Sequence, residues 1–169
     1  MSKTRLYVEK KLSSNIMIYI KNKQHHFLKN VLRIKIQDNI LIFDGQTGEW
    51  LSRVISINRD NIVLQVIQRT RELKPETDVW LIFAPIKLFR MNITIQKATE
   101  LGVSRFVPCI TQNTNQPKIN IRNLQMNIIE ASEQSNRISL PSIDEPVKID
   151  KIVENFPKDR CLIFCNESN

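Results

Sequence analysis

The hydrophobic pattern of the chain changes near its middle, and this change restricts the possible folds more than any other feature. Before it, residues 50–57 and 61–67 alternate apolar and polar side chains, which is typical of an antiparallel hairpin buried on one face. After it, residues 79–84 and 161–165 are continuously apolar, which is typical of strands buried on both faces of a parallel sheet. The polar, proline-containing segment 69–76 between them is the predicted domain boundary.

The first part of the chain, residues 1–72, combines short predicted strands with one predicted helix. In addition to the hairpin, strands are predicted at residues 5–8, 16–20 and 40–43. A helix is predicted over residues 21–33, because four apolar residues between Phe27 and Leu32 recur at helical spacing. Several short strands around one helix favour a small, partly closed β-barrel.

The second part, residues 73–169, alternates apolar strands with amphipathic helices. Strands are predicted at residues 79–84, 104–110 and 161–165, and helices at about 90–101 and 121–135. Gly102 directly follows the first of these helices, at the position where a left-handed residue commonly ends a helix. The order of elements is typical of a parallel α/β domain with right-handed crossovers.

Positive charge is concentrated in the first part of the chain. The formal net charge of the 169 residues is +8 at pH 7. Residues 1–72 contain 13 Lys and Arg against 6 Asp and Glu, whereas residues 73–169 contain 12 against 11. A one-sided basic segment favours binding to RNA, because neutralised phosphates release counterions. The alternative is a lysine-rich surface that is only solvated.

Composition excludes several classes of site. Three glycines are too few for the glycine-rich loops that hold nucleotides, and the sequence has no zinc-ligand spacing and no Ser-His-Asp arrangement. No apolar run has the length of a membrane span or the form of a signal sequence. Cys109, Cys161 and Cys165 lie in apolar runs and are predicted to be reduced, buried thiols. Together these features predict a cytoplasmic protein with no bound metal.

Two basic pairs are candidates for contact with RNA. His26 and Arg33 lie near the end of the helix predicted in the first part, where they could contact phosphates or base edges, or could instead cap the helix. Lys87 and Arg90 follow the carboxyl end of a buried strand, the edge at which parallel α/β sheets bind ligands. These four residues are therefore candidate RNA or substrate contacts.

The last predicted helix has polar candidates on one face. Glu130, Gln134 and Arg137 share this face and could contact a polar substrate. Glu133 lies four residues before Arg137, so these two could instead form an ion pair that supports the helix. The spacing alone leaves both interpretations open.

Taken together, these segments resemble one protein family. The motifs, in chain order, are Arg5-Leu6-Tyr7, the stretch from His26 to V-L-R at Arg33, Phe43-Asp44-Gly45, Lys87 with Arg90 and Met91, I-Q-K-A-T-E-L-G-V at residues 95–103, Pro108, E-A-S-E-Q-S-N-R at residues 130–137, and Pro141. The series is similar to that of the ribosomal RNA small-subunit methyltransferase E family across essentially the whole chain. The two long stretches are the most specific part of the resemblance.

The resemblance implies both a fold and an activity. It implies a PUA-like, RNA-binding β-barrel for residues 1–72, followed by the N-terminal portion of a SPOUT-type, trefoil-knot α/β methyltransferase domain in residues 73–169. The family uses S-adenosylmethionine to methylate N3 of a uridine in 16S rRNA of the small ribosomal subunit, a step in ribosome biogenesis. Members of the family are expected to be homodimers.

The resemblance also suggests roles for single residues. In the barrel, Arg5, Arg33 and neighbouring lysines are expected to hold RNA phosphates, and His26 is a further candidate contact. The expected contacts near the methylated base are Lys87, Arg90, Gln134 and Arg137. No residue is assigned as catalytic.

The chain departs from the family pattern in three ways, one of which is that the loop around Asn113 lacks the arginine usually found there, since no arginine lies between Arg105 and Arg122. Leu88, Phe89 and Asn92 stand where the family usually has a glycine and two acidic residues. The G-P-E-G-G loop and the segment after it, which form the knot and bind the cofactor in the family, do not occur up to Asn169. We therefore expect a C-terminally truncated member of the family, with cofactor-binding residues only beyond Asn169, no activity of this chain alone, and weakened dimerisation. The alternative is a non-catalytic RNA-binding protein.

Overall fold

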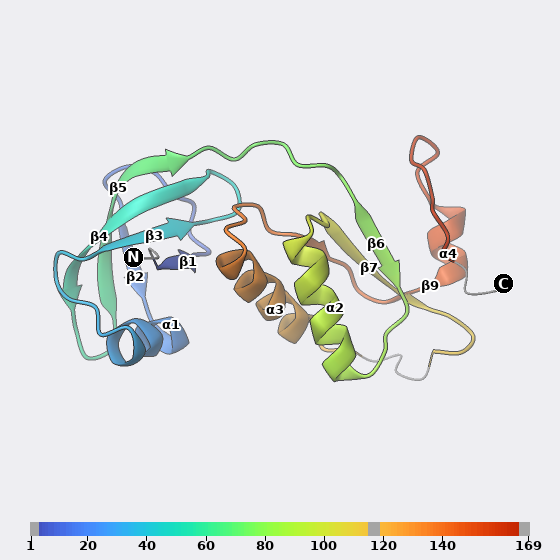
Figure 1. Ribbon diagram of the computed structural model, residues 1–169, viewed down its shortest axis with the longest axis horizontal. Helices are drawn as coiled ribbons and strands as arrows, with labels where there is room; N and C mark the ends of the chain where they lie inside the picture. Colours follow the sequence, from blue (N-terminus) through green and yellow to red (C-terminus); the bar gives the residue numbers. More distant parts are fainter. Residues whose placement is uncertain (1–3, 115–118, 166–169) are drawn as a thin grey trace.

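The computed structural model describes residues 4–114 and 119–165 of the chain. Within these ranges the strands form two main sheets, one from the first part of the chain and one from the second (Figure 1). No helix in the described ranges is both long enough and apolar enough to cross a membrane.

The first sheet has five strands in the order β1-β3-β4-β5-β2. They are β1 (Arg5–Tyr7), β2 (Met17–Ile20), β3 (Asn39–Phe43), β4 (Glu49–Ile57) and β5 (Ile62–Arg71). β1 pairs with β3 in parallel, and the other neighbours are antiparallel. Register shifts along the β4–β5 pair bend these two long strands. The sheet therefore curves, as expected for the predicted small barrel (Figure 1).

Alternate side chains of these strands fill one apolar core. Ile18, Ile42, Val54 and Leu64 are at most 4% exposed, and Leu28 of the helical segment closes the core. Complete burial of one such side chain contributes about 2 kcal/mol. The period-two alternation in the sequence therefore directs every second side chain into this core, as predicted.

The helical segment after β2 differs from the single amphipathic helix predicted from the sequence. α1 covers Asn22–His26 and continues as a π-helical turn, η1, over Phe27–Val31. Of the four apolar residues in the predicted stripe, Leu28 alone is buried. The other three are exposed, namely Phe27, Val31 and Leu32. The wider π-turn changes the angle between successive side chains, so these three no longer share the buried face.

A buried carboxylate organises the turn between β3 and β4. Asp44 is 4% exposed, and its oxygens accept hydrogen bonds from the backbone N–H groups of Leu12, Gln46 and Thr47 and from Thr47 Oγ1, at 2.6–2.9 Å. Burial alone would raise the pKa of the Asp44 carboxyl. These hydrogen bonds outweigh it and hold the pKa below its usual value. The turn is therefore built around an ionised Asp44.

The second sheet is parallel and has helices on both sides. Its strands are β6 (Trp80–Phe83), β7 (Arg105–Ile110), β8 (Ser142–Ile143) and β9 (Val147–Lys148). β7 pairs in parallel with each of the other three. The helices α2 (Leu88–Glu100) and α3 (Ile121–Gln134) pack together on one side, and the short α4 (Ile149–Glu154) lies on the other (Figure 1). This arrangement confirms the predicted parallel α/β architecture.

The core of the second part lies between β7 and its two long helices. Its fully buried members are Met91, Ile95, Phe106, Leu124 and Ile128. Gly102 follows α2 with a φ of +98°, and the Val103 N–H donates back to the Ala98 carbonyl at 3.0 Å. The predicted glycine stop of this helix is therefore confirmed.

The segment 161–165 is not the buried strand that its apolar sequence predicted. It pairs with no strand in the described part of the chain, and its three central side chains are 52–83% exposed. Cys161 and Cys165 are exposed as well, so the prediction of buried thiols is correct only for Cys109. A strand buried on both faces needs a paired neighbour and a covering layer on each face, and the described residues place neither beside this segment.

Candidate nucleic-acid interface

The seven residues predicted as contacts for RNA or substrate lie in different surroundings. Five of them are exposed, namely His26, Arg33, Lys87, Arg90 and Gln134. The other two, Arg5 and Arg137, are each only 9% exposed. They meet where the first part of the chain contacts the second, and Arg5 Nη2 donates to the Arg137 carbonyl at 3.1 Å.

Arg5 lies between the barrel and the end of α3. On the barrel side, its Nε pairs with the buried Glu49 carboxylate at 2.6 Å. On the α3 side, its Nη1 donates to the carbonyl oxygens of Ser132 and Glu133, both at 3.0 Å. The guanidinium group is thus engaged by internal acceptors, and its surroundings are those of an interdomain contact.

Arg137 is engaged in the same way inside the second part. Its Nη1 donates to the carbonyls of Thr99 and Val103 at 2.9 and 2.7 Å, and its Nη2 pairs with Glu76 at 2.5 Å. It therefore links the residues after α3 to the end of α2. The ion pair with Glu133 that its spacing allowed is not formed.

Glu133 has a partner that the sequence analysis missed. Its Oε1 accepts the backbone N–H of Tyr7 at 2.8 Å, across 126 positions of the chain. Burial raises the pKa of the Glu133 carboxyl and the Glu130 carboxylate adds to the rise, although the Tyr7 hydrogen bond and the charge of Arg5 oppose it. No local pattern in the sequence could have indicated this contact.

Replacing Glu133 with glutamine should make the stability of the chain less dependent on pH. A carboxyl whose pKa is raised in the folded state destabilises that state as pH rises above its unfolded value of 4.5. We therefore expect Glu133→Gln to gain stability relative to the wild type between pH 4 and pH 7, measured by urea unfolding. The exposed Glu154→Gln should show no such gain, and an equal gain in both variants would contradict the prediction.

Residues of α1, η1 and the turn after them form a basic surface, which is exposed except for the half-buried Lys29, whose Nζ donates to the Asn58 carbonyl at 3.2 Å. We call the surface of Lys23, His26, Phe27, Lys29 and Arg33 the α1 surface. Phe27 is 41% exposed within it. Cationic groups beside an exposed aromatic ring can hold phosphates and stack on an unpaired base. The structure thus brings His26 and Arg33 together with lysines that the sequence analysis did not single out.

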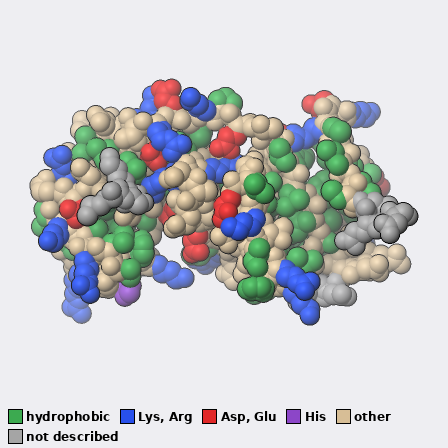
Figure 2. Space-filling view, in the orientation of Figure 1, with side chains coloured by type: hydrophobic (Ala, Val, Ile, Leu, Met, Phe, Trp, Pro, Cys, Tyr) green, Lys and Arg blue, Asp and Glu red, His purple; other side chains and the backbone are tan. Residues whose placement is uncertain are grey.

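A second basic position lies at the start of α2. Lys87 is the N-cap residue and Arg90 lies in the first turn, which contains no acidic residue. Phe89 between them is 76% exposed. Two cations at a helix N-terminus attract phosphate. Figure 2 shows Lys and Arg side chains along the lower edge of the molecule, both over α1 and over the start of α2.

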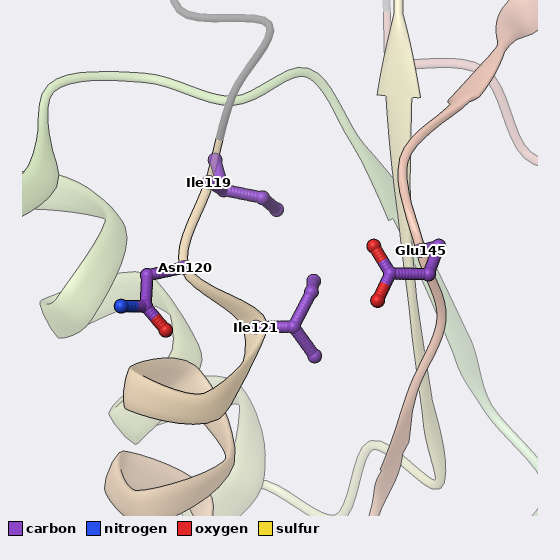
Figure 3. A pocket seen from close by; sticks show the side chains of 4 residues that line it. All are labelled: Ile119, Asn120, Ile121 and Glu145. Atoms are coloured by element: carbon purple, nitrogen blue, oxygen red, sulfur yellow. The ribbon is translucent and has the colours of Figure 1, made fainter.

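A hollow of about 500 Å³ at the start of α3 is a poor match for RNA. Its lining residues are Ile119, Asn120, Ile121 and Glu145. Figure 3 shows the Glu145 carboxylate facing the two isoleucines, with Asn120 turned away from them. Because its one charged group is negative, this hollow repels phosphate and is separate from the basic interface.

Comparison with known proteins identifies the family. The family model described as an RNA methyltransferase domain matches residues 73–169, and the model described as an RNA methyltransferase PUA domain matches residues 20–67. The ribosomal RNA small subunit methyltransferase E of Rickettsia conorii is 29% identical over 168 residues, which are 99% of this chain and 68% of that protein.

Solved structures share the fold. The methyltransferase E structure from Neisseria gonorrhoeae, bound to S-adenosylmethionine, matches with a TM-score of 0.78 and 22% identity, over 92% of this chain and 67% of that one. The putative methyltransferase from Legionella pneumophila, also in complex with this cofactor, matches with a TM-score of 0.79 and 19% identity. This match also covers 92% of this chain and 67% of that one. The chain thus spans about two thirds of the length of these proteins, and it belongs to the RNA methyltransferase family, among the ribosomal RNA small-subunit methyltransferase E proteins.

Proposed function

We propose that this chain provides the RNA-binding barrel and part of the methyltransferase domain for the methylation of uridine N3 in 16S rRNA, with S-adenosylmethionine as the methyl donor. The observation that carries the proposal is the basic, largely exposed α1 surface, which belongs to a barrel joined to a domain of the RNA methyltransferase family. The cofactor bound in two structural relatives supports the choice of donor.

We further propose that the domains are residues 1–72 and 73–169. The first sheet ends at Arg71 and the second begins at Trp80. The residues between them have no secondary structure and are all exposed, as expected for a linker.

In this proposal the RNA contacts are divided by exposure. His26 and Arg33 hold phosphates on the α1 surface, while Lys87 and Arg90 contact the RNA near the methylated base, with Gln134 as a further polar contact. For the buried Arg5 and Arg137 we replace the RNA-binding role expected from the resemblance with a structural one, because their guanidinium groups are engaged by internal acceptors.

The chemistry of uridine N3 is consistent with a basic site. N3 carries a weakly acidic proton, and nearby cations favour the anion that forms when this proton leaves. Most of the remaining rate enhancement comes from holding the base in line with the methyl donor. Lys87 and Arg90 are the exposed cations that we assign to this task.

The hollow at the start of α3 does not fit S-adenosylmethionine. A pocket for such a molecule encloses most of its surface and places a few polar groups around it. The hollow at α3 instead offers two isoleucines and one carboxylate in an open depression. We therefore assign no cofactor-binding residue in the described ranges, and expect no methyl transfer by this chain alone.

Two measurements test this function. Isothermal titration of this chain with S-adenosylmethionine should show no saturable binding, and saturable binding would overturn that expectation. A fusion of this chain to the remaining third of the Rickettsia conorii relative should methylate uridine N3 on small ribosomal subunits. The same fusion carrying Lys87→Glu and Arg90→Glu should lose this activity while keeping its circular dichroism spectrum. A folded fusion that binds RNA but transfers no methyl group would favour the non-catalytic alternative.

Replacing Lys23 and Lys29 with glutamine should weaken the binding of single-stranded RNA and flatten its salt dependence. Each lost phosphate contact lowers the slope of log affinity against log salt by about 0.7 for single strands, so we expect a decrease of about 1.4 for the double variant. Fluorescence anisotropy over a salt series measures the slope. Lys151→Gln on α4 is the matched control and should leave it unchanged, and an unaltered slope in the double variant would contradict the role of the α1 surface.

A further inference from the structure

The last turn of α3 obtains its positive charge from the other domain. The final carbonyls of a helix lack partners within the helix and are stabilised by a nearby cation. The last turn of α3 contains no basic residue. Arg5 of β1 donates to the carbonyls of Ser132 and Glu133 at 3.0 Å, and to that of Arg137 at 3.1 Å. The barrel thus caps a helix of the methyltransferase domain.

The contact is reciprocal. β1 is the edge strand of the first sheet, so one of its sides lacks a neighbouring strand. The Glu133 carboxylate accepts the Tyr7 N–H there at 2.8 Å. Arg71 Nη1 adds a third contact, to the Asn136 carbonyl at 3.1 Å. Each domain therefore supplies hydrogen-bond partners for backbone groups that have no partner within the other domain.

The covalent linker does not hold the domains at a fixed angle by itself. Residues 72–79 have no secondary structure and are all exposed, and interfaces between domains allow relative motion unless specific contacts prevent it. The buried contacts of Arg5 and the partly buried contact of Glu133 restrict such motion. On the barrel side, the Glu49 carboxylate fixes the Arg5 guanidinium through an ion pair with Nε at 2.6 Å.

We propose that Arg5 and Glu133 form an interdomain clamp, which fixes the α1 surface relative to the start of α2 so that one RNA strand contacts both. This inference rests on the proposed RNA-binding function. Two contacts on a rigid body reinforce each other, because binding of the first raises the effective concentration of the strand at the second. A loosened clamp reduces this gain for a long RNA, whereas an RNA short enough to contact only the barrel is bound as before.

The first test measures the orientation of the domains. Spin labels are attached to cysteines at Asp60 in the barrel and Gln125 on α3, in the full chain with Cys161→Ser and Cys165→Ser. The wild-type background should give one narrow distance distribution. The clamp variant, Arg5→Met with Glu49→Gln, removes the guanidinium without leaving a buried carboxylate unpaired, and should at least double the width of the distribution.

Matched variants separate the clamp from general damage to the fold. Glu49→Gln alone keeps the bonds from Arg5 to α3 and should give the narrow distribution. Glu133→Gln keeps an acceptor for the Tyr7 N–H and should also stay narrow, whereas Glu133→Ala should broaden the distribution even if the Arg5 variant does not fold. Narrow distributions in both Glu133→Ala and the Arg5 variant would overturn the proposal.

The second test measures RNA affinity at two lengths, with oligouridylates of 6 and 20 nucleotides. The clamp variant should lose about tenfold in affinity for the longer RNA and less than twofold for the shorter one. An equal loss at both lengths, or no loss, would overturn the link between clamp and RNA. If the wild type binds neither RNA in a salt-dependent manner, the proposed function fails, while the distance measurement still decides whether the clamp exists.

Discussion

Replacing Arg137 with glutamine is expected to lower the free energy of unfolding of the chain by about 3 kcal/mol, the cost of leaving a buried hydrogen-bond acceptor without its charged donor. Arg137 holds the carbonyls of Thr99 and Val103 at 2.9 and 2.7 Å, and Thr99 is fully buried. Glutamine is too short to reach both carbonyls, so at least one buried acceptor loses its hydrogen bond. Urea unfolding followed by circular dichroism measures the change.

Arg105 provides a matched control for this prediction. It also forms an ion pair, with Asp144 at 2.8 Å, but the two side chains are 39% and 29% exposed. Exposed pairs contribute at most about 1 kcal/mol, so Arg105→Gln should cost much less than Arg137→Gln. Equal losses in the two variants would show that burial of the Arg137 network is not the source of its effect.

The parts of the fold that could be predicted are those with a long, regular pattern. Residues 50–57 and 61–67 alternate over many positions, and they form the β4–β5 hairpin because one face of it is buried. α2 and α3 were predicted within about two residues, from the apolar spacing along each helix and from Gly102 at the end of the first. These signals are local, so the sequence carries them without knowledge of tertiary contacts.

The parts that were missed depend on contacts far along the chain. β8 and β9 have two residues each, too few to show any periodicity. The segment 161–165 has the composition of a buried strand, but composition does not supply the neighbour that a strand must pair with.

Residues of the candidate site were likewise predictable only where the signal in the sequence is local. The exposed cations Lys87 and Arg90 were indicated by their place after a strand, and the structure leaves both on the surface. The surroundings of Arg5 could not be foreseen, because its partner carbonyls begin 127 positions later, at Ser132. A motif such as E-A-S-E-Q-S-N-R identifies a family, but does not by itself distinguish a residue that contacts RNA from one that joins two domains.

Replacing Asp44 with alanine is expected to destabilise the chain by about 3 kcal/mol at pH 7, because a buried ionised acceptor is removed and several donors lose their partner at once. Among these donors, the Leu12 N–H is buried in the barrel, 2.9 Å from Asp44 Oδ2. Thermal and urea unfolding measure the loss. Asp38 is the matched control, since it also accepts a backbone N–H, from Lys35 at 2.7 Å, but in an exposed turn. Asp38→Ala should therefore cost less than about 1 kcal/mol.

The pH dependence of Asp44→Ala tests the same mechanism separately. The pKa of Asp44 is lowered in the folded state from 3.8, so its stabilising contribution is complete above pH 3.8 and is lost as pH falls through the lower, folded value. The difference in stability between wild type and Asp44→Ala should therefore be constant from pH 5 to pH 8 and should shrink below pH 4. A difference that stayed constant at low pH would mean that the side chain acts by packing, because packing does not depend on ionisation.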